Sequence, residues 1–468
     1  MKFFNKFSIT LIGAVAIVAT AQLTPVVAIS TQISSVSVVA GTKAEDFFMQ
    51  GNDKYKKGDY QGAVEAYTQA IVLNPNYVEA YNSRGNSRRA LGDSQGAFVD
   101  YDRALRINPN FAMAYYNRGN ARFNLGDKQG AVADYDQALR INPNFALAYN
   151  GRGNARRGLG DNQGAIADYD RALRIYPNDA YAYVGRGSAR SQLGDNQGAL
   201  ADYNEALRID PNDADVYVGR GNARSALGDK QGALADYTEA LRINPKYASA
   251  YNNRGMLRSE LGDNKGAIAD FDAALQNNPN LLQAYENRGL ARLTLGDKEG
   301  ALADFNQVLR INPNDALAYY QRGNLRYVSG DNQGALADYN EAVRINPNFA
   351  AAYGNRGNAR DDLGDSKGAI ADYDRALQIN PKYALAYLNR GVTRSRLGDK
   401  QSALADFNTA LQIDPNLAGA YLSRGITRAE LGEKPGAMQD FQKAADLFQK
   451  QGDQNNYQKA VNNLRKIQ

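Results

Sequence analysis

The feature that most constrains the fold of this chain is a unit of 34 residues that repeats through most of its length. Proline recurs at every 34th position from residue 75 to residue 415, and glycine does so from residue 51 to residue 425. A period of this length is typical of repeat architectures, in which each unit buries its apolar face against its neighbours. The chain therefore divides into twelve units: 44–77, 78–111, 112–145, 146–179, 180–213, 214–247, 248–281, 282–315, 316–349, 350–383, 384–417 and 418–451.

Each unit has the pattern of two helices joined by a tight turn, as residues 112–145 illustrate. Gly126 supplies the left-handed residue that ends a first helix, and Asp127 can cap the next one. Asn142-Pro143 ends the second helix, because the residue before proline is pushed out of helical geometry. The second helix carries one apolar stripe, made of Ala131, Tyr135, Ala138 and Leu139. We therefore predict an all-α solenoid of about twelve helix-turn-helix units.

The unit resembles the tetratricopeptide repeat, a family of 34-residue helix pairs. In residues 112–145 the matching residues are Tyr115, Gly119, Ala131, Tyr135, Ala138 and Pro143. The repeated core is also similar to the LGDxxGAIADY subtype of exported bacterial proteins. The resemblance implies a right-handed superhelix whose first helices line a concave groove, and it implies binding of protein or extended peptide. This chain departs from the family pattern in having Arg118 where leucine is usual and Arg122 where an aromatic residue is usual.

Two arginines recur on the first helix of the unit, four residues apart and hence on one face. An aspartate recurs in the second helix at the same period. The first unit, which has Gln50 in place of the arginine, also has Ala66 in place of the aspartate. We therefore predict an Arg–Asp ion pair inside each unit, with the second arginine sharing the aspartate or reaching a neighbouring unit. The predicted pairs include Arg118 with Asp134, Arg152 with Asp168, and Arg220 with Asp236.

The residue after the unit glycine is asparagine in seven of the twelve copies. An amide side chain can donate to a peptide bond and accept from it, so a row of asparagines suits an extended chain. The candidate residues of the groove are Asn86, Asn120, Asn154, Asn222, Asn324 and Asn358. The alternative is that these amides cap or bridge neighbouring helices.

Two pairs of aromatic residues stand seven apart on predicted first helices, so each pair shares a helix face. They are Tyr116 with Phe123 and Tyr320 with Tyr327. Aromatic anchors are typical of binding hot spots, and we include all four among the candidate groove residues. Packing between successive units is the alternative.

Composition argues against several other functions. The chain has no cysteine, which excludes thiol catalysis and thiolate metal sites, and no histidine, which removes the commonest general base and the commonest transition-metal ligand. We therefore predict no enzyme activity, no cofactor and no metal site, and we interpret the acidic residues Asp361, Asp362 and Asp365 as solvated. The balance of 55 basic and 50 acidic residues gives no reason to expect nucleic acid.

The two ends of the chain differ from the repeats. Residues 1–28 have the basic start, apolar middle and small residues of a signal peptide, with cleavage after Ala21 or Ala28. An uncleaved membrane anchor is the alternative, and residues 29–43 form a flexible lead. Residues 452–468 are predicted to form a capping helix with an apolar stripe of Tyr457, Val461, Leu464 and Ile467.

These observations predict a non-catalytic protein-binding or peptide-binding scaffold, used in envelope protein assembly or complex formation. The expected location is the periplasm, a lumen or the extracellular space, with no stable membrane insertion after cleavage. The alternative is an electrostatic binder of anionic polymers that uses the arginine ladders.

Overall fold

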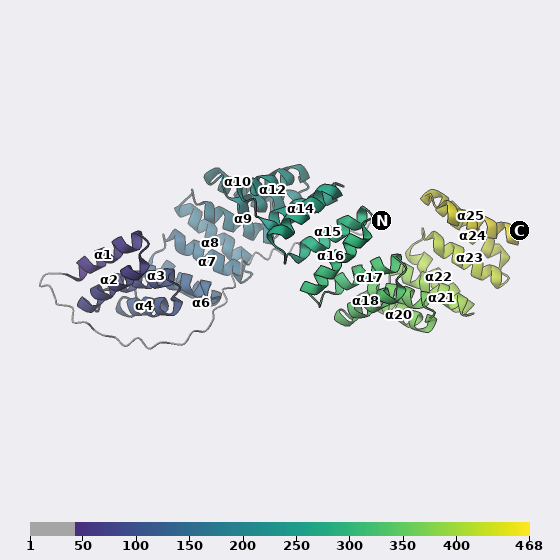
Figure 1. The fold of residues 1–468 in the computed structure, drawn as a ribbon, viewed down its shortest axis with the longest axis horizontal. Coiled ribbons are helices and arrows are strands. Elements are labelled where there is room, and N and C mark those ends of the chain that lie inside the picture. The colour runs from purple at the N-terminus through teal and green to yellow at the C-terminus, as the bar shows by residue number, and fades with distance from the viewer. Residues whose placement is uncertain (1–42) are drawn as a thin grey trace. The chain divides into compact units, whose positions relative to one another are not determined.

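A computed structural model describes residues 43–468, and the predicted signal peptide and nearly all of the predicted lead lie outside this range. The described residues form helices and turns without a strand, which confirms the predicted all-α fold. The helices, most of which are labelled in Figure 1, are α1 (Ala44–Lys56), α2 (Tyr60–Leu73), α3 (Val78–Ala90), α4 (Ser94–Ile107), α5 (Ala112–Asn124), α6 (Lys128–Ile141), α7 (Ala146–Gly158), α8 (Asn162–Ile175), α9 (Ala180–Gln192), α10 (Asn196–Ile209), α11 (Ala214–Ala226), α12 (Lys230–Ile243), α13 (Ala248–Glu260), α14 (Asn264–Asn277), α15 (Leu282–Thr294), α16 (Lys298–Ile311), α17 (Ala316–Val328), α18 (Asn332–Ile345), α19 (Ala350–Asp362), α20 (Ser366–Ile379), α21 (Ala384–Arg396), α22 (Lys400–Ile413), α23 (Ala418–Glu430), α24 (Lys434–Gln451) and α25 (Gln454–Ile467).

The helices pair into hairpins, each made of an odd-numbered first helix and the even-numbered second helix that follows it. Helices α1–α4 belong to one compact unit, which ends at Pro109. Helices α5–α25 belong to a second unit, which spans Asn110–Gln468. Within the second unit, each hairpin packs against the next one in chain order.

The turn inside each hairpin follows from the Gly-Asp dipeptide. Gly126 has a φ of 87°, a left-handed conformation that costs little only for glycine, and it ends α5. Asp127 then caps α6 by accepting a hydrogen bond of 2.8 Å from the backbone nitrogen of Gly130. Both features confirm the roles predicted for these residues.

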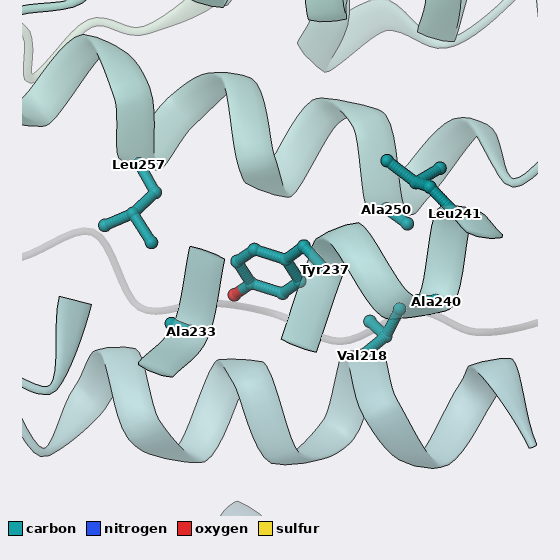
Figure 2. Close-up of a cluster of buried hydrophobic side chains, with 7 residues drawn as sticks. All are labelled: Val218, Ala233, Tyr237, Ala240, Leu241, Ala250 and Leu257. Atoms are coloured by element: carbon teal, nitrogen blue, oxygen red, sulfur yellow. The ribbon is translucent and has the colours of Figure 1, made fainter. Parts of the chain in front are cut away.

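The core of each hairpin is an aromatic ring of the second helix that packs among small residues. Tyr135 is almost fully buried, as are Ala131 and Ala138 of the same helix. Gly119 permits this packing, because a Cβ atom at that position would lie only 2.8 Å from the Tyr135 ring. Successive hairpins complete the core for each other, and Figure 2 shows this for Tyr237 of α12, which lies among side chains of α11, α12 and α13.

Helix α25 packs on the last hairpin. Ala460 of α25 is fully buried in a cluster with Leu447 and Phe448 of α24, and Tyr457 and Val461 pack against the same cluster. The structure thus gives the predicted capping helix an apolar face in contact with α24. Among residues 43–468, no helix is long and apolar enough to cross a membrane.

Candidate peptide-binding face

The arginines and aspartates form a network that joins the two helices of each hairpin from the second one onward. Asp168, on α8, is 2% exposed and accepts hydrogen bonds from Arg152 Nε at 3.0 Å and from Arg152 Nη2 at 2.5 Å. Arg156, one turn further along α7, donates from Nη1 to the same carboxylate at 2.9 Å. The planar guanidinium suits this two-point contact with a carboxylate, which fixes the register of α7 against α8.

The other predicted pairs have the same geometry. Arg118 Nη2 lies 2.6 Å from Asp134 Oδ1, and Arg220 Nη2 lies 2.6 Å from Asp236 Oδ1. In these hairpins, too, the second arginine shares the aspartate of its own hairpin.

The first arginine of the unit reaches the neighbouring hairpin. Arg152 Nη1 lies 2.5 Å from Asp136 Oδ1 on α6, in the preceding hairpin. The equivalent partners elsewhere are Thr68, Asp170, Asn204, Thr238, Asp272, Asn306, Asn340, Asp374 and Asn408. One guanidinium therefore bonds within its hairpin and across the joint to the hairpin before it.

These arginines are engaged with protein partners. The guanidinium of Arg152 lies 5.4 Å from the ring centre of Tyr149, in addition to its two carboxylate partners, and the side chain is only 16% exposed. A polyanion that used the ladder would have to displace a carboxylate from each arginine it bound.

We predict that Asp168→Ala will lower the free energy of unfolding by about 3 kcal/mol, because two partly buried guanidinium groups lose their shared partner. Urea unfolding followed by circular dichroism measures the change. Asp136→Ala is the matched control, since this carboxylate is 44% exposed and its removal should cost less than about 1 kcal/mol. Equal losses for the two variants would contradict this account.

The asparagines that follow the unit glycine are bonded to the core of their own hairpin. Asn120 Oδ1 accepts a hydrogen bond of 2.7 Å from the Tyr135 hydroxyl group. The same bond joins Asn52 to Tyr67, Asn86 to Tyr101, Asn154 to Tyr169, Asn222 to Tyr237, Asn324 to Tyr339, and Asn358 to Tyr373. The bond satisfies a buried hydroxyl group, which is the structural role that the sequence analysis left open as an alternative.

The first-helix residue that follows the unit glycine changes together with the buried ring of the second helix. Where the first-helix position is apolar, the second-helix residue fifteen positions later is phenylalanine, in the pairs Met256 with Phe271, Leu290 with Phe305, Val392 with Phe407, and Ile426 with Phe441. Ser188 keeps a tyrosine, Tyr203, with the two hydroxyl oxygens 3.3 Å apart. The first-helix residue therefore depends on whether the buried ring carries a hydroxyl group.

We predict that Tyr135→Phe will lower the free energy of unfolding by about 1 kcal/mol, because the Asn120 oxygen loses its donor. The double variant Asn120→Leu with Tyr135→Phe should recover most of this loss, since it recreates the Leu290–Phe305 pair found in the same chain. A double-mutant cycle measured by urea unfolding tests the coupling. Additive losses would show that the two positions are independent.

The four candidate aromatic residues pack between hairpins. The Tyr116 ring centre lies 5.0 Å from that of Phe145, and Tyr116 and Phe123 both pack against a cluster formed by Ala131, Tyr135 and Ala155. In the same way, Tyr320 and Tyr327 pack against Ala335, Tyr339 and Ala359. All four side chains are thus half-buried and contribute to the joints, which is the alternative role stated for them.

The three acidic residues near the end of α19 have protein partners. Asp362 and Asp365 are nevertheless exposed to solvent, in agreement with their interpretation as solvated, whereas Asp361 is largely buried. Asp361 forms an ion pair with Arg396 and accepts a hydrogen bond from Thr393. Asp362 accepts a hydrogen bond of 2.6 Å from the Tyr327 hydroxyl group, and Asp365 caps α20. Among residues 43–468, no group of three histidine, cysteine, aspartate or glutamate residues is placed to hold a metal ion.

The pKa of one other carboxyl group is shifted from its ordinary value. Glu286, on α15, has its pKa raised to about 7 by burial, and the nearby negative charge of Asp315 adds to this effect. A fraction of these carboxyl groups is therefore protonated at neutral pH.

The structure also shows apolar side chains that the sequence analysis did not single out. Seven large apolar residues of first helices in residues 110–468 are exposed at two places of the unit, the second and the ninth. They are Met113, Leu147, Tyr181 and Leu385 at the second place, and Met256, Val392 and Ile426 at the ninth. These places are seven residues apart and share one helix face, which also holds the asparagines of the ninth place. We call this surface the first-helix face.

Comparison with known proteins identifies the family. A model described as TPR repeat matches residues 51–92, 85–126, 221–262, 323–364 and 357–398. Three models described as tetratricopeptide repeat match residues 112–145, 157–220, 255–316 and 384–417. The chain therefore belongs to the tetratricopeptide-repeat proteins, and none of these models describes an enzyme. A search of curated protein sequences found no match.

Several solved structures resemble the chain. The APC/C hetero-tetramer Cut9–Hcn1 gives 14% identity over 91% of this chain and 96% of that one, with a TM-score of 0.47. A tetratricopeptide-repeat protein from Parabacteroides merdae gives 24% identity over 53% and 98%, with a TM-score of 0.43. Yeast Tom70 gives 17% identity over 91% and 95%, with a TM-score of 0.38. These likenesses concern the repeated helical hairpin and identify no partner.

Proposed function

We propose that this protein is a non-catalytic scaffold that binds extended segments of other proteins along the first-helix face of residues 110–468. The observation that carries the proposal is the row of exposed apolar side chains on that face, at the second and ninth places of the unit. Exposed apolar groups that recur on one face of a protein are typical of interaction sites. Proteins with this repeat usually bind other proteins, which supports the same conclusion.

Two asparagines of this face, Asn324 and Asn358, have an amide N–H group left for a partner. Asn324 Oδ1 accepts from both Tyr339 and Asn355, and Asn358 Oδ1 accepts from both Tyr373 and Asn389. Their Nδ2 groups make no hydrogen bond to another residue of the described chain. A free N–H donor beside an apolar side chain suits the carbonyl group and the side chain of an extended peptide. The amides would thus hold the partner's backbone while the apolar residues contact its side chains.

The anionic-polymer alternative depends on the arginine ladders. Each arginine of the ladders in residues 110–468 already has a carboxylate partner in its own hairpin. An anionic polymer would therefore have to compete with these aspartates for the guanidinium groups. The proposed binding surface is therefore the apolar and amide face.

We predict that Leu147→Ser will weaken binding of a selected peptide about fivefold, because a leucine that becomes covered on binding contributes about 1 kcal/mol. The peptide is chosen by panning the full chain against a displayed library of random 12-residue peptides, and fluorescence anisotropy gives the affinity.

Leu159→Ser is the matched control for this variant. Leu159 follows the same helix, α7, and is 47% exposed, against 53% for Leu147, but it lies at the turn and outside the first-helix face. Its replacement should leave the affinity unchanged. Failure of the wild-type chain to enrich any peptide above background would contradict the proposed function.

We further propose that the protein is exported and acts in the assembly of envelope proteins or of a complex there. The basic and apolar composition of residues 1–28 supports export. We predict that the protein isolated from cells will begin at Gln22 or Ile29, which mass spectrometry of the intact chain measures. A chain that retains residues 1–28 would favour the anchored alternative.

A further inference from the structure

One arginine on the first helices of residues 110–468 differs from all the others. The arginines of the ladders are paired with aspartates of their own hairpins, and Arg396 is paired with Asp361. Arg157, on α7, has no carboxylate within ion-pair distance, and its Nε is buried without an acceptor. A guanidinium group that lacks an anion inside the protein is available to an anion from outside it.

The neighbouring hairpins place no acid beside Arg157. The two positions equivalent to Arg157 and Gly158 hold Phe123 and Asn124 in the preceding hairpin, and Ser191 and Gln192 in the following one. The equivalent positions on both sides of Arg157 along the stack of hairpins therefore hold no acid.

A second cation at the same end of α7 also lacks an acid. Lys128 Nζ donates a hydrogen bond of 2.8 Å to the carbonyl oxygen of Gly158, the residue next to Arg157. At the equivalent joints, Lys230 and Lys400 bind carboxylates, Glu260 at 2.9 Å and Glu430 at 3.2 Å. Glycine at position 158 removes this carboxylate, so the joint between α6 and α7 keeps an excess of positive charge.

A hydroxyl donor completes the site. Asn154 Oδ1 accepts a hydrogen bond of 2.6 Å from Tyr169, and Asn154 Nδ2 donates to the hydroxyl oxygen of Tyr181, on α9. The Tyr181 hydroxyl is thereby used as an acceptor, and its own hydrogen has no acceptor in the described chain. Tyr181 is 59% exposed, so this O–H group is accessible to a partner.

Arg157 lies at the same cluster. Burial raises the pKa of Tyr169 to about 12, and the nearby positive charge of Arg157 opposes that rise. Arg157 and Tyr181 therefore both adjoin the Asn154–Tyr169 pair, where a cation and a hydroxyl donor can bind one anionic group together.

We propose that Arg157 and Tyr181, in the field of Lys128, bind the carboxylate of an aspartate or glutamate in the protein segment that occupies the first-helix face. This inference rests on the proposed function, and it adds the position along the face at which one acidic residue of the partner binds. A guanidinium group binds a carboxylate at two points, and the phenol adds a third donor. At the positions equivalent to Arg157 and Gly158 on the other first helices of residues 110–468, the charged residues are acidic or already paired, as with Asp362, Glu430 and Arg396, so one acid of the partner is fixed at α7–α9.

The test uses the full chain and the displayed library of random 12-residue peptides. We expect the selected peptides to share an acidic residue at one position. We expect Arg157→Gln to weaken the best peptide about tenfold, because hydrogen bonds to a charged group are strong. A version of the peptide with glutamine in place of its acid should bind the wild-type chain and Arg157→Gln equally, and Arg157→Lys should keep part of the affinity.

Arg310→Gln is the matched control, because Arg310 is an exposed arginine of a second helix without an acidic partner in the described chain. It removes the same charge and should leave peptide affinity unchanged. The inference is overturned if selected peptides share no acid, or if Arg157→Gln and Arg310→Gln weaken binding equally. Polyphosphate binding more tightly than the best peptide, and weakened equally by the two variants, would favour a polyanion and also overturn it. If no peptide is selected at all, the proposed function fails first and the inference fails with it.

Discussion

The structure depends on a guanidinium group that, in most hairpins, bonds in two directions. In the fourth hairpin, Arg152 holds Asp168 of its own second helix and Asp136 of the hairpin before it. Desolvation offsets much of the attraction in such pairs, so their main contribution is to specify how the helices are aligned. The apolar core between hairpins consists largely of alanine and one ring, which could pack in more than one register. The ion pairs select one of these arrangements, and this alignment places the second and ninth residues of successive first helices on a common face.

Much of the fold could be predicted from the sequence, because its determinants are local and repeated. Gly126, Asp127 and Pro143 act within a few residues of themselves, so they mark where helices begin and end in every unit. The Arg–Asp partners could also be inferred, because Gln50 and Ala66 change together in the first unit. Which of the two arginines crosses the joint could not be inferred, since this depends on the distance between stacked hairpins and not on any spacing within one.

The candidate site was harder to predict. The asparagines were singled out by their recurrence, yet their bonds to Tyr135 and its equivalents appear only when the two helices are placed together. The sequence did contain a signal for this bond, since phenylalanine replaces the tyrosine in every unit where an apolar residue replaces the asparagine. The aromatic candidates share a helix face, but the adjacent hairpin covers that face, so Tyr116 and Tyr320 are half-buried. Exposure of Leu147 or Tyr181 likewise depends on how far the neighbouring hairpin extends.

The coupling between the buried ring and the ninth residue has a consequence for how copies of the unit diverge. A single substitution that turns an asparagine such as Asn358 into an apolar residue leaves the buried hydroxyl group of Tyr373 without its acceptor. A change of the ring alone leaves the amide oxygen without this donor. A new side chain at the ninth place of the unit is therefore introduced with the smallest loss of stability when the buried ring is replaced at the same time. The four copies with phenylalanine have completed that exchange, whereas the copy with Ser188 has altered its surface residue and kept the ring. Gene duplication followed by such two-step drift would diversify what the array recognises while leaving its architecture unchanged.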